Sequence, residues 1–153
     1  MYATYKDYTE IYYGDVLTDD NADRWLDRAS DFVDKITFGR LQTAYPTDEQ
    51  SDIYIKKSVC AVAEALYLID AQKKAGAAQI GADGSYKNPV ASVSSGRESI
   101  SYALSGGSTV YAAAAANKAA ADSYTMSIAA EYLANVADAN GTNLLYAGVD
   151  PFV

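Results

Sequence analysis

The fold of this chain is decided by residues 47–76, which read TDEQSDIYIKKSVCAVAEALYLIDAQKKAG. Large apolar residues recur there at alternating steps of four and three, the spacing of one face of an α-helix. They are Ile55, Val59, Val62, Leu66 and Ile69. Thr47 is expected to cap this helix, with Gln50 at the capping-box position. Cys60 and the alanines around it widen the apolar face, so we expect the helix to contact neighbours on two sides.

On the N-terminal side, residues 19–36 predict an amphipathic helix capped by Thr18 or Asp19. Its apolar stripe consists of Ala22, Trp25, Leu26, Ala29, Phe32, Val33 and Ile36. Its other face carries Asp23, Asp27, Asp31 and Asp34. Because arginines and a lysine are interspersed with these acids, we interpret the face as solvated rather than as a metal site. A shorter helix is expected over residues 4–13, ending at Gly14.

On the C-terminal side, one long helix is predicted from Ser108 to about Ala137, followed by the turn signal Asn140–Gly141. The intervening segment 76–107 holds most of the glycines. It is longer than a simple connecting loop in a compact domain, so we expect it to have a function or a structure of its own. Polar and apolar residues alternate over 97–104, which predicts a strand that pairs with residues 90–94. An isolated hairpin is marginal in water, so this one needs helices or another subunit to support it.

These elements predict an all-α fold, a small bundle of three to four helices with a loop carrying a short β-hairpin and an extended C-terminal tail. We expect one domain over residues 1–153, with a helical core at about 4–75 and 108–138, the loop at 76–107 and the tail at 140–153. The tail is apolar, which is unusual for a terminus, so it either packs on its own core or docks on a partner. Its members are Leu144, Leu145, Tyr146, Gly148, Val149, Pro151 and Phe152.

Composition excludes several classes of function. The 153 residues include no histidine, which rules out Ser-His-Asp triads, Cys-His dyads and His-ligated metals. The single cysteine, Cys60, allows no internal disulfide and is expected to be a buried structural thiol. A net charge of −8 disfavours a surface that grips nucleic acid. No stretch is apolar enough to predict a membrane span, and no cofactor is expected.

Two observations leave alternatives open. Glu64 and Glu131 lie in apolar surroundings. One hypothesis is a small hydrolase in which these acidic residues alone carry out catalysis. The simpler interpretation is that each glutamate pairs with a lysine or faces water. Five of the fourteen tyrosines lie in the first thirteen residues. Tyrosine is frequent at interfaces, so these side chains are expected either in the core or at a contact with another protein.

Four segments in order along the chain resemble the head–tail connector (adaptor, or head-completion) family of tailed bacteriophages. They are ASDFVDKITFGR at 29–40, IKKSVCAVAEAL at 55–66, VSSGRESISY at 93–102 and LLYAGV at 144–149. Together they span nearly the whole chain.

The resemblance implies a structural, non-enzymatic virion protein at the capsid–tail junction, assembled in the bacterial host cytoplasm. The family forms rings, usually dodecamers, that join the portal protein to a stopper or tail protein and extend the DNA channel. DNA would pass through without specific binding, as the net negative charge favours. The resemblance implies that the C-terminal tail docks on the portal. It places the loop residues toward the channel or the next ring, namely Val93, Arg97, Glu98, Ile100 and Tyr102. A helical adaptor or oligomerisation protein outside any virus is the alternative.

Overall fold

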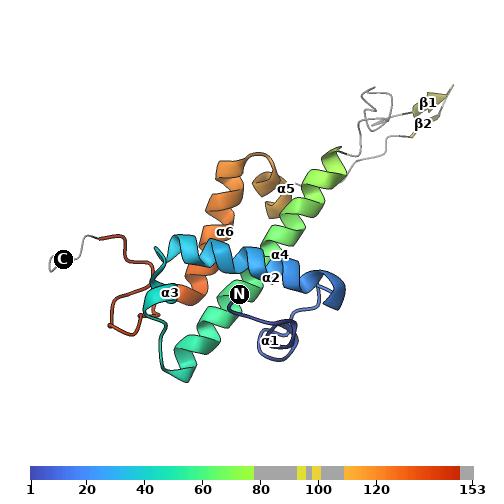
Figure 1. The fold of residues 1–153 in the computed structure, drawn as a ribbon. Coiled ribbons are helices and arrows are strands. Elements are labelled where there is room, and N and C mark those ends of the chain that lie inside the picture. Colours follow the sequence, from blue (N-terminus) through green and yellow to red (C-terminus); the bar gives the residue numbers. More distant parts are fainter. Residues whose placement is uncertain (78–92, 96–97, 101–108, 149–153) are drawn as a thin grey trace.

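The long helix at the centre of the sequence, α4 (Glu49–Ala77), is also the centre of the fold, and four other helices pack against it (Figure 1). This computed structural model describes residues 1–77, 93–95, 98–100 and 109–148. The chain is mostly helical, as predicted. The predicted apolar face of α4 supplies the core, because Ile55, Val59, Val62 and Ile69 are buried and Leu66 packs against them. Cys60 is fully buried, as expected for a structural thiol.

The start of α4 differs from the prediction by one residue. The carboxylate of Asp48, rather than the hydroxyl of Thr47, accepts a hydrogen bond from the backbone N–H of Ser51 at 2.8 Å. That N–H is one of the donors that a helix leaves unsatisfied in its first turn. The hydrogen bonds to Ser51 lower the pKa of Asp48 below its ordinary value.

Helix α2 (Asp19–Ile36) matches its predicted bounds and crosses α4 (Figure 1). Thr18 is its N-cap, and the backbone N–H of Thr18 donates to Asn21 Oδ1 at 3.0 Å. The predicted stripe is buried except for Phe32, which is partly buried. Helix α1 (Tyr5–Glu10) is shorter than predicted, with Thr4 as its N-cap. The short helix α3 (Arg40–Thr43) was not predicted and follows Gly39, whose φ of 72° favours glycine.

The single long helix predicted from Ser108 to about Ala137 is wrong. Two helices occupy this region, α5 (Val110–Ala115) and α6 (Lys118–Leu133). Asn117 separates them because its backbone is extended and its side chain accepts from the N–H of Ala120 at 2.8 Å. An asparagine that satisfies the next helix in this way competes with helix continuation. The small alanine side chains of α5 bury little area to oppose the break.

Strands β1 (Val93–Ser95) and β2 (Glu98–Ile100) pair antiparallel, with Val93 opposite Ile100 and Ser95 opposite Glu98. Residues 78–92, 96–97 and 101–108 lie outside the described residues, and so do Arg97 and Tyr102 of the predicted ring loop. The hairpin's role therefore stays a prediction. In the part of the chain that the structure describes, no helix is both long and apolar enough to cross a membrane.

Candidate functional site

The predicted C-terminal tail begins inside the chain's own core. Asp138 closes a turn at Asn140–Gly141, and its carboxylate accepts from the N–H groups of Asn140 and Thr142 at 2.9 Å. The chain then reverses, and the N–H of Leu144 donates to the carbonyl of Val136 at 2.9 Å. Leu144 is fully buried in the main core cluster and Leu145 packs partly against it. This corrects the expectation for Leu144, which is a core residue rather than a docking residue.

Arg40 ties this returning segment to the corner where α2 meets α3. Its Nη1 donates to the carbonyls of Asn143 and Leu144 at 3.3 and 3.2 Å. Its guanidinium carbon also lies 5.5 Å from the ring centroid of Phe38. One cation therefore holds both the C-terminal segment and an aromatic side chain, by charge-assisted hydrogen bonds and a cation–π contact.

Two large aromatic side chains of the segments that Arg40 joins remain exposed. Phe38 is 60% exposed and Tyr146 is 53% exposed. The N–H of Tyr146 donates at 3.1 Å to the same Asn143 carbonyl that Arg40 contacts. We call Phe38, Arg40, Leu145 and Tyr146 the corner patch. The remaining predicted tail residues Val149, Pro151 and Phe152 lie outside the described residues, whereas Gly148 is the last residue described.

The backbone at Phe38 is strained, with a φ of 56°. A bulky residue in the left-handed region is uncommon and costs of the order of 1 kcal/mol or more. Here the conformation ends α2 and places an aromatic ring in water. Sequence analysis did not single out Phe38 or Arg40. A large apolar residue followed by glycine just after a helix end was the available signal.

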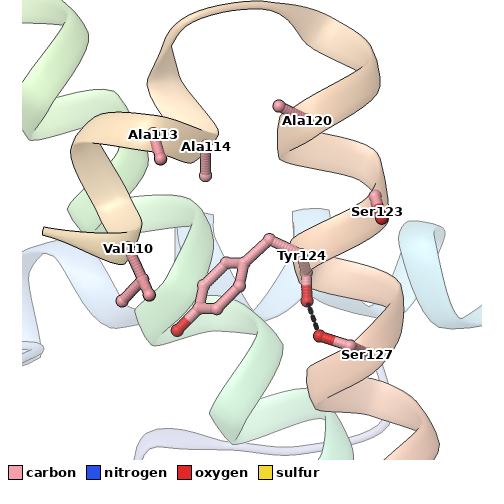
Figure 2. Close-up of a pocket in the computed structure, with 7 residues that line it drawn as sticks. All are labelled: Val110, Ala113, Ala114, Ala120, Ser123, Tyr124 and Ser127. Carbon is pink, nitrogen blue, oxygen red and sulfur yellow. Dashed lines mark hydrogen bonds between the residues drawn. The ribbon is translucent and has the colours of Figure 1, made fainter. Parts of the chain in front are cut away.

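A second apolar surface lies between α5 and α6. Figure 2 shows Tyr124 of α6 extending its ring toward Val110 of α5, with alanines of both helices above it. The groove encloses about 420 Å³ and is lined by Val110, Ala113, Ala114, Ala120, Ser123, Tyr124 and Ser127. Val110 is 59% exposed. In Figure 1, α5 lies beside the upper end of α4, whereas α3 and the C-terminal segment lie at the lower left. The corner patch and the α5–α6 groove therefore belong to different ends of the molecule.

Glu64, one of the two candidate acids, is held by tyrosines. Its carboxylate accepts from Tyr8 Oη at 2.5 Å and from Tyr12 Oη at 3.2 Å. Glu131 and Tyr132 share with it a cavity of about 130 Å³. Both oxygens of Glu64 are thus used to join the N-terminal segment to α4. In the part of the chain that the structure describes, no group of three or more acids and cysteines is placed to hold a metal ion.

Three N-terminal tyrosines and Tyr45 form a partly buried layer that binds carboxylates. Besides Tyr8 and Tyr12, Tyr2 donates to Asp34 at 2.5 Å and Tyr45 donates to Asp52 at 2.8 Å. Burial, together with these acids, raises the pKa values of Tyr2, Tyr12 and Tyr45. Burial and the hydrogen bond to Glu64 raise the pKa of Tyr8 to about 12. Of the two explanations for the tyrosine-rich start, packing within the chain accounts for Tyr2, Tyr8 and Tyr12, whereas Tyr13 is exposed.

These phenols predict a loss of stability in alkali. Because their native pKa values are raised above the ordinary value of 10.0, the native state binds more protons than the unfolded state above pH 10. Their contribution is complete below pH 10 and declines as pH rises through about 12, by up to about 1.4 kcal/mol per pH unit for each proton. Urea unfolding across this range, followed with phenolate absorbance, measures it. A constant free energy of unfolding above pH 10 would contradict the assignment.

Comparison with known proteins gives no match among family models, curated proteins or solved structures. Function must therefore be argued from the residues and surfaces of this chain.

Proposed function

We propose that the chain is a structural virion protein that forms an oligomeric ring between the portal vertex and the tail or stopper of a tailed bacteriophage. The observation that carries this proposal is the corner patch. It presents two exposed aromatic side chains, Phe38 in contact with Arg40 and Tyr146 on the segment that Arg40 holds, at the point where the chain continues into an apolar terminus. Exposed aromatic and arginine side chains are the types that dominate protein–protein interfaces.

The arrangement of surfaces supports a ring subunit in a second way. A ring with a portal on one side and a stopper on the other must offer each subunit several different contact surfaces, because its neighbour contacts are head-to-tail. The corner patch and the α5–α6 groove are two such surfaces at different ends of the molecule. In this proposal the corner patch with residues 146–153 meets the portal. The hairpin residues Val93, Glu98 and Ile100, with Arg97 and Tyr102, face the channel or the next ring.

Removal of residues 146–153 tests this function. The truncated chain keeps Leu144 in the core and the Arg40 contacts to Asn143 and Leu144, so its helical content and unfolding midpoint are expected to stay near wild type. In a phage that encodes this chain, the truncation should abolish the joining of heads to tails. Particle composition and infectivity measure the effect.

Phe38→Ala is the matched point variant, since it removes the other exposed aromatic of the corner patch and keeps the Cβ at this φ of 56°. It should weaken joining without lowering stability. Normal incorporation of the truncated chain into infectious particles would refute the proposal. Stable oligomers that never associate with a portal would instead favour the non-viral adaptor function.

A further inference from the structure

A trough lies over the C-terminal half of α4, between α2 and α6. It encloses about 610 Å³. Its apolar members are Trp25, Leu66, Ile69 and Ala121, and its charged members are Arg28, Asp70, Lys73, Lys118 and Asp122. The two acids are already paired, Asp70 with Lys74 at 2.7 Å and Asp122 with Lys118 at 2.5 Å.

Cations gather around this trough although the chain as a whole is acidic. Arg24 and Arg28 lie over the ring of Trp25, with 5.2 and 5.0 Å from guanidinium carbon to ring centroid. The pKa of Asp122 is lowered, chiefly by its hydrogen bond to Lys118. The positive charges of Lys35 and Lys73 lower it further, which places both lysines near this carboxylate. We call this surface the basic trough. It is defined by Arg24, Arg28, Lys35, Lys73, Lys74 and Lys118, which are six of the twelve lysines and arginines.

Four of these cations form no direct ion pair. Among the residues that the structure describes, Arg24, Arg28, Lys35 and Lys73 have no carboxylate within ion-pair distance. An unpaired cluster of like charge is unfavourable by itself and is relieved by an acidic partner.

The other flank of α2 carries the opposite charge. Asp19, Asp23, Asp27 and Asp31 recur every four residues and are exposed, with Asp20 beside them. Arg24 and Arg28 follow Asp20 in the neighbouring row of this helix, and Lys35 follows Asp31 by the same spacing of four residues. None of the five acids forms an ion pair among the described residues. The acidic flank, Asp19 to Asp31, therefore borders the basic trough along α2.

We propose that the basic trough of one copy of this chain receives the acidic flank of α2 from a second copy. This inference rests on the proposed function and names the contact between neighbouring ring subunits. The two surfaces differ, so the contact is heterologous and its repetition generates a ring when the rotation closes. Each copy supplies both surfaces, and the exposed acids of one match the unpaired cations of the next. The carboxylates of Asp70 and Asp122 within the trough disfavour a continuous phosphate backbone as the occupant.

Two double charge reversals test the contact. Lys35→Glu with Lys73→Glu cancels the excess positive charge of the trough, and Asp27→Lys with Asp31→Lys removes most of the negative charge of the flank. All four side chains are exposed and lack ion-pair partners among the described residues, so both variants should fold. Sedimentation velocity should show that wild type self-associates at about 50 mM salt and does so less at about 0.5 M, because salt screens exposed charges.

Each variant alone should lose self-association by at least about tenfold in Kd, since one of its two surfaces has then lost most of its charge. A mixture of the two variants should form pairs again, because the trough variant keeps its acidic flank and the flank variant keeps its basic trough. Lys6→Glu with Lys57→Glu, on α1 and the first half of α4, changes the net charge by the same amount as the trough variant and should leave association unchanged. Equal loss in this control would assign the effect to net charge and overturn the inference.

Other outcomes would also overturn the inference. Undiminished association of both variants would place the contact elsewhere and leave the proposed function standing. A wild-type chain that stays monomeric at every protein and salt concentration would show that this contact does not form. The truncation of residues 146–153 tests the proposed function independently. Binding of duplex DNA to wild type that the trough variant abolishes would reassign the trough to nucleic acid.

Discussion

Gly14→Ala is expected to destabilise the chain by about 2–4 kcal/mol, because the added methyl group has no space. A Cβ at Gly14 would lie 2.2 Å from two ring carbons of Tyr8 and 2.5 Å from its hydroxyl oxygen. The ring cannot move aside, since Tyr8 is fully buried and its hydroxyl is held on three sides. It accepts from the N–H groups of Val16 and Leu17 at 2.8 and 3.0 Å and donates to Glu64. Urea unfolding measures the change.

Gly148→Ala is the matched control. A Cβ there would lie 2.1 Å from the ring of Tyr146, as close as the Cβ at Gly14 would lie to the ring of Tyr8. Tyr146 is 53% exposed, so its ring can rotate into water, and the expected cost is within about 0.5 kcal/mol. Equal costs at the two glycines would show that Tyr8 is not locked in place by its hydrogen bonds.

Leu144→Ala is the second large effect, expected to cost about 2–4 kcal/mol of unfolding free energy. Leu144 is fully buried against the main core, although only nine residues of the given sequence follow it. Its backbone is fixed by the N–H bond to Val136 and by Arg40, so the cavity left by alanine cannot close by a shift of the segment. Thermal and urea unfolding measure the loss.

Tyr146→Ala, two residues further on, should change stability by less than about 0.5 kcal/mol because that side chain is largely in water. The two substitutions separate a core residue from a candidate docking residue within the same predicted tail. An unchanged midpoint for Leu144→Ala would show that the segment detaches from the core in solution, and would favour the alternative in which the tail docks on a partner.

Sequence patterns predicted the elements whose stability is local and periodic. The apolar stripes of α2 and α4 appear directly in the spacing of Trp25, Leu26, Ile55 and Val59, since a helix repeats every 3.6 residues. The cap at Thr18 and the turn at Asn140–Gly141 were predictable for the same reason, because each depends on only a few consecutive residues. The apolar character of the C-terminal segment was also visible.

The prediction was wrong where neighbouring alternatives compete closely. Asp48 and Thr47 are both good caps, and only the path of the chain into α4 decides between them. Asn117 interrupts an alanine-rich stretch that favours helix on both sides, and the break depends on how α5 turns to pack against α4 and α6. In both places the local preferences differ little, so tertiary packing determines the outcome.

By itself, then, the sequence determined the helical class, the two principal amphipathic helices and the chemistry that is excluded by the lack of histidine. Tertiary structure alone decided that Glu64 joins Tyr8 and Tyr12, that Leu144 is a core residue, and that Arg28 of α2 lies in one trough with Lys73 and Lys118. The physical reason is sequence separation. Tyr8 and Glu64 are 56 residues apart and Arg40 and Leu144 are 104 apart, so no local periodicity reports that they meet.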